Sequence, residues 1–445
     1  MNQRLLIAAT SSDCGKTTLT LALLAALKAR GIPLLSYKSG PDYIDPAFHR
    51  QALGIESYNL DPFFLDSDGL CQMLDLAHDR LAIMEGAMGY YDGIGLEGKC
   101  SSYELAQATH TPVILLINGK KLYQSVAAMA QGYRDFRLDS RIKGVILNRI
   151  KPYLYPGMSA MLAQVGIKTY GFLPELPEAE LASSYLGLKQ PTDEKWSRVL
   201  RSLAAAAEEY LDLDGLLELA NSAPELRYQK REMEPLGSFK LAVARDAAFC
   251  FLYPENILLL EKMGAEVSYF SPLAGDTLME DIDALYLPGG YPEQYAKELA
   301  ASASRFILKE ALEQGMPCIA EGGGFLYLQE KLQGQPMVGF LEGSSELTDH
   351  LQGFGYHYIE PREIGAYLLG QAGQPFPAHC FHYCRTDGPG QDYSYRRAAS
   401  GKSKFSGYGG IRLYSGMAHL YFPAMLNEIS NFARQALAYQ TEKQN

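Results

Sequence analysis

The chain has few cysteines, no long apolar run and no basic segment, and each shortage excludes a class of protein. Its seven cysteines are odd in number and irregularly spaced, which argues against a disulfide framework and indicates the reduced thiols of a cytoplasmic protein. No stretch approaches the roughly 20 apolar residues that span a bilayer. The formal net charge is −11 and no basic arm is present, so general nucleic-acid binding is not expected.

Two successive α/β patterns indicate the domain organisation. A length of 445 residues is enough for two or three domains with their own cores. In the first half, short apolar runs alternate with helical patterns, which is typical of a parallel sheet. The expected strands are residues 5–9, 33–37, 81–85, 112–117, 143–148 and 168–173. The pattern starts again at residues 239–244 and continues through 265–270, 284–287 and 317–320.

A charged stretch at residues 227–234, followed by Pro235 and Gly237, separates the two patterns. Residues 190–223, which precede it, have the spacing of an amphipathic helical segment. We therefore predict two α/β domains, over residues 1–230 and 238–445.

A phosphate-loop pattern follows the first expected strand and opens a helix predicted over residues 16–29. Backbone N–H groups in such a loop surround phosphates, while Lys16 reaches the β- and γ-oxygens and Thr17 binds Mg²⁺. The match is imperfect, because the usual pattern has glycine at Thr10 and Asp13 adds a negative charge. A helix N-terminus with a chance match is the alternative, and the order strand, loop, helix disfavours it. The expected ATP-binding residues are Ser11, Ser12, Gly15, Lys16, Thr17 and Thr18.

Four carboxylates follow expected strands, where ligands bind in open α/β sheets. Asp42 and Asp45 lie in a segment of turn-forming residues after the second strand, and Glu85 and Asp92 lie at and beyond the end of the third. They are candidates to bind metal or to orient a substrate. The alternative is that the aspartates only cap turns, which is the less favoured interpretation beside a phosphate loop.

Two finer assignments belong to the same edge. The expected Mg²⁺ ligands are Thr17, Asp45 and Glu85. Asn148, which ends the strand at 143–148, is a candidate to bond the nucleotide base, although asparagine at a strand end is often only a turn residue.

The chain resembles the cobyrinic acid a,c-diamide synthase family, glutamine-dependent amidotransferases of cobalamin biosynthesis, over nearly its whole length and in the same order. Two segments carry most of this resemblance: Gly40-Pro41-Asp42-Tyr43-Ile44-Asp45-Pro46 and Pro288-Gly289-Gly290-Tyr291-Pro292-Glu293. Further matching segments are Asn59-Leu60-Asp61-Pro62, residues 85–93, 112–117, 144–149, 171–174, 244–249 and 270–273, and Phe381-His382-Tyr383.

The resemblance implies a fold and a reaction. A P-loop, dethiobiotin-synthetase-like domain would be followed by a class I glutamine-amidotransferase-like domain. The first would use ATP and Mg²⁺ to phosphorylate acetate carboxylates of a corrinoid or related tetrapyrrole, and ammonia would displace the phosphate. The residues that would handle metal, substrate and the phosphorylated intermediate are Asp42, Asp45, Glu85 and Asp92. A homodimer is the assembly that the resemblance suggests.

The second domain lacks the sulfur nucleophile that the family uses to hydrolyse glutamine. The family's Ala-Glu-Cys-Gly-Gly pattern falls on residues 320–324, so Gly322 occupies the nucleophile position. The catalytic histidine is retained as His419, a second histidine is replaced by Tyr421, and the oxyanion-hole segment is retained as Gly289-Gly290. We therefore predict absent or very weak glutaminase activity.

Other departures from the family concern cysteines and one segment of the first domain. Cys318 is expected to point into the core, whereas Cys380 lies in a motif that is expected to pass near His419, so a relocated thiol is the minor alternative. The family's Arg-His-Leu-Gly-Leu segment has become Ser184-Tyr185-Leu186-Gly187-Leu188.

Two functions remain open at this point. The first is an ATP-dependent ligase that amidates a tetrapyrrole carboxylate with ammonia, free or delivered by another protein. The second is a non-catalytic paralogue that binds nucleotide or tetrapyrrole in a regulatory or delivery role. A partitioning-type ATPase is not favoured, because such proteins have no Pro-Gly-Gly-Tyr-Pro-Glu domain.

Overall fold

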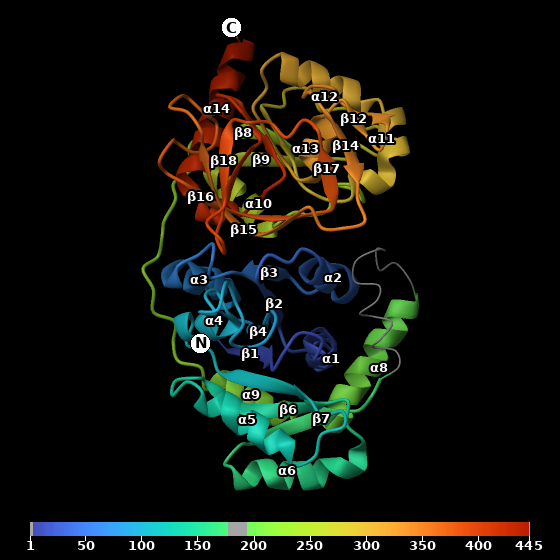
Figure 1. The fold of residues 1–445 in the computed structure, drawn as a ribbon, viewed down its shortest axis with the longest axis vertical. Helices are drawn as coiled ribbons and strands as arrows, with labels where there is room; N and C mark the ends of the chain where they lie inside the picture. Colours follow the sequence, from blue (N-terminus) through green and yellow to red (C-terminus); the bar gives the residue numbers. More distant parts are fainter. Residues whose placement is uncertain (1–2, 177–193, 445) are drawn as a thin grey trace. The chain divides into compact units, whose positions relative to one another are not determined.

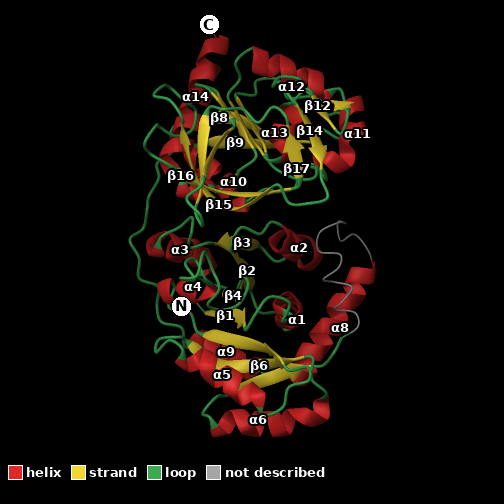
Figure 2. Cartoon of the chain, in the orientation of Figure 1, coloured by secondary structure: helices red, strands yellow, loops and turns green. Residues whose placement is uncertain are grey.

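The structure, a computed structural model, describes residues 3–176 and 194–444. The chain divides into two compact units, Met1–Arg231 and Glu232–Asn445, and each is described by itself (Figures 1 and 2). The segment 224–238 between their last and first regular elements contains no helix or strand. Among the described residues, no helix is long and apolar enough to cross a membrane.

The first unit is built on a parallel sheet of seven strands in the order β3-β2-β4-β1-β5-β6-β7. The central strand β1 is buried along its length. The strands are β1 (Arg4–Ala9), β2 (Leu34–Ser39), β3 (Ser57–Leu60), β4 (Leu81–Glu85), β5 (Val113–Asn118), β6 (Ile142–Asn148) and β7 (Thr169–Leu173). The helices are α1 (Lys16–Ala29), α2 (Ile44–Leu53), α3 (Ser67–Leu74), α4 (Ser102–Ala108), α5 (Ser125–Asp135), α6 (Tyr155–Gln164), α8 (Glu194–Tyr210) and α9 (Leu213–Asn221).

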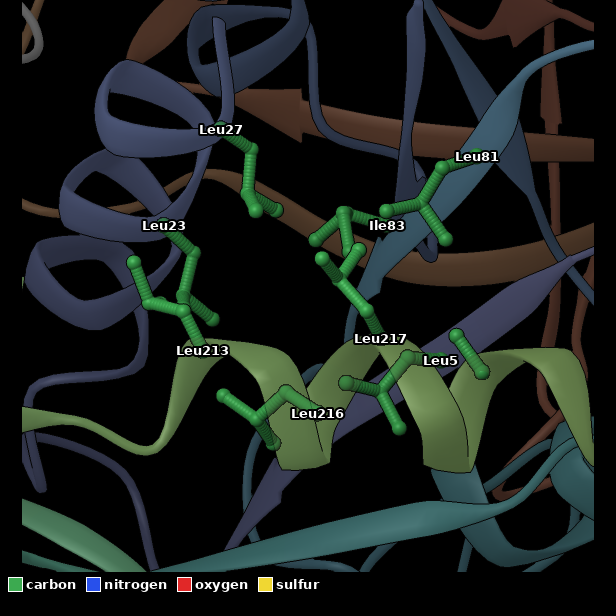
Figure 3. A pocket seen from close by; sticks show the side chains of 9 residues that line it. Leu5, Leu23, Leu27, Leu81, Ile83, Leu213, Leu216 and Leu217 are labelled. Atoms are coloured by element: carbon green, nitrogen blue, oxygen red, sulfur yellow. The ribbon is translucent and has the colours of Figure 1, made fainter. Parts of the chain in front are cut away.

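Leucines of α1 and α9, which lie near the start and the end of this unit's sequence, pack together on one side of the sheet. Leu23 and Leu27 of α1 face Leu213 and Leu216 of α9, with Ile83 of β4 beside them (Figure 3). A fully buried leucine or isoleucine contributes about 1.5–3 kcal/mol, so these contacts fix α1 firmly against the sheet. The N-terminus of α1 is thereby held beside the ends of the central strands.

The second unit is built on a six-stranded sheet in the order β20-β21-β11-β10-β8-β9, in which only the pair β20–β21 is antiparallel. A four-stranded sheet, β13-β12-β14-β17, and a five-stranded antiparallel sheet, β19-β18-β15-β16-β22, complete it.

The strands of the six-stranded sheet are β8 (Phe239–Ala244), β9 (Ala265–Phe270), β10 (Ala284–Leu287), β11 (Cys318–Glu321), β20 (Tyr408–Gly409) and β21 (Leu413–Gly416). The other strands are β12 (Lys331–Leu332), β13 (Gln335–Pro336), β14 (Ser344–Leu347), β15 (Gly353–Pro361), β16 (Phe376–His382), β17 (Cys384–Thr386), β18 (Tyr393–Arg397), β19 (Ser403–Ser406) and β22 (His419–Leu420). The α-helices are α10 (Pro254–Met263), α11 (Ala296–Ala301), α12 (Ser304–Glu313), α13 (Gly323–Leu328) and α14 (Leu426–Gln444).

The predicted fold class, a parallel α/β domain followed by an amidotransferase-like α/β domain, is confirmed, and the local differences have physical reasons. The polar strand β3 was not expected, because only its pairing with β2 stabilises so short an element. The segment around Asp45 was expected to be a loop, but the chain enters α2 at Ile44. The helical segment 190–223 is divided by Leu211 and Asp212, and Asp212 caps α9 by accepting the amide N–H of Gly215 at 2.9 Å.

Candidate active site

The phosphate loop joins β1 to α1, and its shape depends on Gly15. This residue has φ +97°, a left-handed conformation that favours glycine. A Cβ atom there would lie 2.2 Å from Nδ2 of Asn148, which in turn donates to the carbonyl of Cys14 at 2.7 Å. Asn148 is 4% exposed, so its amide packs directly under the loop. Its predicted contact with a nucleotide base remains a prediction, while its contact with the loop backbone was not foreseen.

Lys16 links the loop to the segment that follows β4. The ammonium group is buried and donates to the carbonyl of Met88 and to that of Ser11, the latter at 3.3 Å. Met88 has φ +48°, an uncommon conformation for a non-glycine residue that aims its carbonyl at Lys16. Burial lowers the pKa of Lys16, and the charge of Lys38 lowers it further. An anion at the loop would therefore stabilise the charged form.

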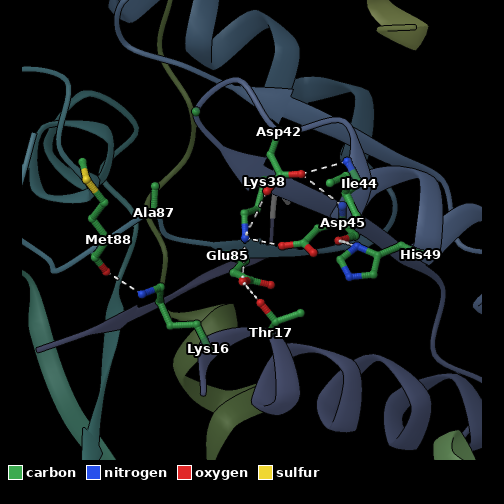
Figure 4. A network of polar contacts seen from close by, with 12 residues as sticks. Lys16, Thr17, Lys38, Asp42, Ile44, Asp45, His49, Glu85, Ala87 and Met88 are labelled. Carbon is green, nitrogen blue, oxygen red and sulfur yellow. Dashed lines mark hydrogen bonds and ion pairs between the residues drawn. The ribbon is translucent and has the colours of Figure 1, made fainter. Parts of the chain in front are cut away.

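Three carboxylates surround one lysine that the sequence did not single out (Figure 4). Nζ of Lys38 contacts Asp45, lies 2.7 Å from Oε1 of Glu85 and lies 3.8 Å from Oδ2 of Asp42. Thr17 donates its hydroxyl to the same Oε1 of Glu85 at 2.7 Å. Lys38 and Glu85 are direct partners on β2 and β4, so the sheet register itself brings this pair together.

Burial and mutual charge decide the protonation of this cluster. Burial raises the pKa of Glu85, and burial together with the nearby Asp45 raises the pKa of Asp42 to about 6. Burial acts in the same direction on Asp45, but the charge and hydrogen bond of Lys38 outweigh it and lower the pKa of Asp45. Burial opposes the charge on Lys38, yet its three carboxylate neighbours hold its pKa well above the usual value.

Asp42 and Asp92 also shape the backbone. Oδ1 of Asp42 accepts the amide N–H groups of Ile44 and Asp45, at 2.8 and 3.1 Å, and thereby caps the start of α2. Oδ2 of Asp92 accepts the amide N–H of Gly89 at 3.2 Å, in the turn that follows Met88. The structure thus brings Asp42, Asp45 and Glu85 together around Lys38 and holds Asp92 in the neighbouring loop.

The remaining residues assigned to ATP lie on the loop and the first turn of α1. Ser11 and Ser12 are exposed, and the hydroxyl of Ser11 donates to the carbonyl of Ser12 at 3.0 Å. Thr18 is half-buried in the first turn of α1. These positions are compatible with backbone N–H groups turned to a phosphate.

The predicted Mg²⁺ ligands were tested against the groups that surround them. Oε2 of Glu85 is fully buried and has no hydrogen-bond partner among the described residues. Within that part of the chain no three His, Cys, Asp or Glu side chains form a ready metal cluster, and the ammonium of Lys38 lies between Asp45 and Glu85. The free carboxylate oxygen beside the hydroxyl of Thr17 fits a hard cation that takes oxygen ligands.

In the second unit, Gly322 forms a sharp turn between β11 and α13, as the sequence predicts. Its φ and ψ are +51° and −109°, a conformation that favours glycine. The backbone holds it on both sides, because its amide donates to the carbonyl of Gly416 at 2.8 Å and its carbonyl accepts from Leu326 at 3.1 Å. The turn at the predicted nucleophile position is therefore formed by a residue without a side chain.

The imidazole of His419 fills the space above this turn. A Cβ atom on Gly322 would lie 2.5 Å from Cε1 of His419, and one on Gly289 would lie 2.3 Å from the same atom. The ring is buried, lies 6.0 Å from the ring of Phe251, and has its pKa lowered to about 3 by burial. The predicted histidine and the predicted nucleophile position are thus adjacent, and the ring stands where a cysteine side chain would begin.

The oxyanion-hole segment Gly289-Gly290 passes beside the same turn. The carbonyl of Gly289 accepts the amide N–H of Phe251 at 2.9 Å, and a Cβ on Gly323 would lie 3.0 Å from the amide nitrogen of Gly290. Their role as an oxyanion hole remains a prediction.

Neither of the two cysteines considered as substitutes faces His419. The motif of Cys380 does pass beside it, since β16 pairs with β22, but His379 is the direct partner of His419. Neighbouring residues of a strand point to opposite faces, and Cys380 lies in the core, where burial raises its pKa to about 12. Cys318 is fully buried, as expected, and burial raises its pKa.

Two functional candidates were missed by sequence reasoning. Lys38 lies two residues before the matching segment that begins at Gly40, and a lysine near the end of a buried strand was a usable signal. Glu321 precedes Gly322, is fully buried, and accepts the hydroxyl of Tyr286 and the amide N–H of Leu420, each at 2.7 Å. It thereby holds the strand that carries His419. The altered segment at residues 184–188 lies outside the described residues.

Comparison with known proteins gives matches over both units. The family model of a CobQ/CobB/MinD/ParA nucleotide binding domain matches residues 5–186, and that of a CobB/CobQ-like glutamine amidotransferase domain matches residues 240–418.

Curated relatives match at similar levels. The chain is 33% identical to a cobyrinate a,c-diamide synthase of Thermoplasma volcanium, over 99% of both chains. It is 37% identical to a protein of that name from Listeria innocua, over 85% of this chain and 86% of the relative. It is also 37% identical to a hydrogenobyrinate a,c-diamide synthase of Brucella abortus, over 85% of this chain and 88% of the relative.

Proposed function

Because the chain belongs to the cobyrinate a,c-diamide synthase family, we propose that it catalyses the ATP-dependent amidation of acetate carboxylates of cobyrinic acid or a related tetrapyrrole. The reaction passes through an acyl phosphate and uses ammonia in place of its own glutamine hydrolysis. The observation that carries the proposal is the convergence of Lys16, Thr17, Lys38 and the carboxylates of Asp45 and Glu85 at one end of the sheet.

The first step transfers a phosphoryl group to the substrate. A substrate carboxylate oxygen attacks the γ-phosphorus of ATP, and ADP leaves with the bonding electrons. Lys16 and Lys38 offset negative charge on the transferring group, and the backbone N–H groups around Gly15 hold the phosphates. Lys16 must exchange the carbonyl of Met88 for a phosphate oxygen, which is favourable because its charge is buried.

The second step replaces phosphate by nitrogen. The lone pair of ammonia attacks the carbonyl carbon of the acyl phosphate, inorganic phosphate leaves, and the nitrogen loses a proton to give the amide. Asp42, with its pKa raised to about 6, and Asp92 are placed near this edge to orient the substrate and receive that proton.

Mg²⁺ would be held by Thr17, Asp45 and Glu85, the residues predicted for it. When bound, the ion supplies positive charge to the phosphate oxygens and orients them. The buried, unbonded Oε2 of Glu85 supports this assignment.

The state of the second unit supports ammonia as the nitrogen source. Without a thiol at position 322 no thioester can form, and the ring of His419 stands only 2.5 Å from where the Cβ of a cysteine would begin. Neither Cys318 nor Cys380 faces that position, since both lie in cores of the second unit.

The alternative is a non-catalytic paralogue that binds nucleotide or tetrapyrrole. The changed segment at 184–188 and the changed phosphate loop favour it, whereas the paired charges around Lys38 favour the ligase.

A panel of tetrapyrrole acids, incubated with ATP, Mg²⁺ and either ammonium or glutamine, decides between them. The ligase proposal expects mass shifts of one or two amidations with ammonium, little change with glutamine, and no glutamate release. Lys16→Ala is expected to abolish the shift, while Lys143→Ala, an exposed lysine on β6, is the matched control. No mass change with any tetrapyrrole would favour the paralogue, and robust glutamate release would refute the loss of glutaminase activity.

A further inference from the structure

One face of the five-stranded sheet gathers aromatic side chains and arginines that the ligase chemistry does not use. Directly opposed residues of antiparallel strands point to the same side. Phe354 of β15 opposes Phe381 of β16, with ring centroids 6.2 Å apart. Tyr358 opposes Arg396 of β18, whose guanidinium lies 5.0 Å from the tyrosine ring. We call this surface the aromatic–arginine face.

The face continues onto β19 and is open to solvent. Phe405 joins it through Ser394, its partner on β18, and the guanidinium of Arg362 lies 4.5 Å from the ring of Phe405. The exposed fractions of Phe354, Phe381 and Phe405 are 52%, 45% and 52%. Neighbouring aromatic rings exposed to this extent mark interaction surfaces.

The charge of this region differs from that of the chain. The protein has 51 acidic and 40 basic residues, yet residues 393–412 contain basic residues and no acidic one. The basic residues are Arg396, Arg397, Lys402, Lys404 and Arg412. Only Arg412 is paired, with Glu442, and within the described residues no ion pair involves the other four or Arg362. Glu360, on the same face, directs its carboxylate to the amide of Gly373 at 2.9 Å.

The geometry of the two stacked arginines suits carboxylates. A guanidinium lying flat on an aromatic ring keeps its N–H edge available, and that edge matches the two oxygens of a carboxylate. The guanidinium groups of Arg396 and Arg362 lie over the rings of Tyr358 and Phe405, 5.0 and 4.5 Å from the ring centroids. The other exposed rings of this face, Phe354 and Phe381, can contact a flat apolar ligand.

We propose that the aromatic–arginine face binds the carboxylate-bearing macrocycle that the enzyme amidates. The ligand class is a tetrapyrrole with peripheral carboxylates: its ring covers Phe354 and Phe381, and its carboxylates bond Arg362 and Arg396. The four strands β19, β18, β15 and β16 span about 14 Å at a spacing of about 4.8 Å, a width that a large planar ligand can cover. This inference rests on the proposed function for the identity of the ligand and adds a binding role for the second unit.

The test measures binding and not turnover. Cobyrinic acid is titrated against the full chain without ATP, by equilibrium dialysis, for the wild type and for Arg396→Ala, Arg362→Ala and the double variant. We expect each single substitution to raise Kd about tenfold, as loss of a charge-assisted hydrogen bond does, and the double variant to raise it more. Arg396→Lys keeps the charge but loses the planar edge, so we expect a smaller rise.

The matched control is Arg245→Ala. Arg245 is exposed and its guanidinium lies over the ring of Tyr269, 4.8 Å from the centroid, but it follows β8 of the six-stranded sheet and is not part of the five-stranded sheet. Its replacement should leave Kd unchanged, and the KM for ATP should be unchanged in all variants. Cobinamide, in which the acetate side chains are amides, should bind weakly and without dependence on Arg396.

An unchanged Kd for cobyrinic acid in the double variant would overturn the proposal, as would cobinamide binding with the same dependence on Arg396. So would Arg396-dependent retention of RNA in preference to the macrocycle, because the face would then serve a different ligand. Failure of the proposed function is read separately, since a chain that binds cobyrinic acid through Arg396 but never changes its mass is a binder and not a ligase.

Discussion

The cluster around Lys38 and the turn at Gly322 both lie where a parallel strand ends, yet only the first gathers several charged side chains. In the first unit, Nζ of Lys38 contacts three carboxylates. It lies 2.7 Å from Glu85 and 3.8 Å from Asp42, and it also contacts Asp45. In the second, Gly322 forms the turn at the predicted nucleophile position, and the ring of His419 stands where a Cβ atom would begin. The backbone turn of such a site can therefore form without a reactive side chain.

The reason lies in how each site is held together. Buried charges depend on one another, so removal of one leaves the others unpaired at a large cost. The groups around Gly322 are uncharged near neutral pH: backbone amides, a histidine whose pKa is lowered by burial, and Glu321, whose pKa burial raises to about 8. A residue without a side chain at position 322 leaves no buried charge unpaired, so the fold around the turn does not depend on a reactive group there.

The largest expected effect tests the charged cluster. Lys38→Met leaves Asp45 and Glu85 buried without their cation, so we expect a loss of about 3–5 kcal/mol of unfolding free energy and at least a hundredfold loss of amidation. Urea denaturation and the ammonia-driven mass assay measure the two effects. Lys143→Met is the matched substitution of an exposed lysine. Unchanged stability would mean that the charges do not depend on one another as argued.

The next effect concerns Gly15, whose backbone conformation the phosphate loop requires. Gly15→Ala introduces a Cβ 2.2 Å from Nδ2 of Asn148 at φ +97°, so we expect the KM for ATP to rise about thirtyfold, which corresponds to about 2 kcal/mol. Adding Asn148→Gly removes the clash but not the backbone strain, so it should recover only part of the loss. Full recovery would show that the steric clash alone limits the loop.

The corresponding change in the second unit is Gly322→Cys. The new Cβ meets His419 at 2.5 Å and φ is +51°, so we expect a loss of about 1–3 kcal/mol and no restored glutamine hydrolysis. The thiol should react slowly with iodoacetamide, and faster when His419→Ala is added. Robust glutamate release by the single variant would mean that the unit lacked only its nucleophile.

The last prediction is a dependence of stability on pH that should belong to the second unit. Burial raises the pKa of Glu321 to about 8, above its unfolded value, so the folded state binds the extra proton and stability falls as the pH rises from about 5 to 8. Since one pKa unit corresponds to about 1.4 kcal/mol, we expect a loss of roughly 2 kcal/mol or more. Glu321→Gln should flatten this slope in urea denaturation, and an unchanged slope would assign it to other groups.

The sequence predicted those helices and site residues whose positions depend only on neighbouring residues in the chain. The helix over residues 16–29 follows directly from a glycine and Lys-Thr-Thr after an apolar run, and its bounds agree with α1. The carboxylates at the strand ends followed from the known edge of parallel sheets. Asp45 was placed in a loop because Asp-Pro often forms turns, although proline also fits the first turn of a helix, as it does in α2.

The remaining features depend on contacts that a single sequence does not display. Lys38 acquires its partners from Asp45 on the next helix and Glu85 on the next strand of the sheet. The five-stranded sheet pairs residues that are distant in sequence, such as His379 and His419. The position of the His419 ring depends on an atom missing from Gly322, nearly a hundred residues earlier.

The positive φ of Gly322 makes glycine and cysteine unequal in free energy at this position. The surrounding hydrogen bonds hold that conformation whichever residue occupies it, and any residue with a β-carbon would pay about 1–3 kcal/mol to adopt it. Glycine at this position is therefore relaxed, whereas a cysteine would be strained even before the imidazole is displaced. The backbone of the turn thus favours a residue without a side chain, and restoring a thiol there would cost stability.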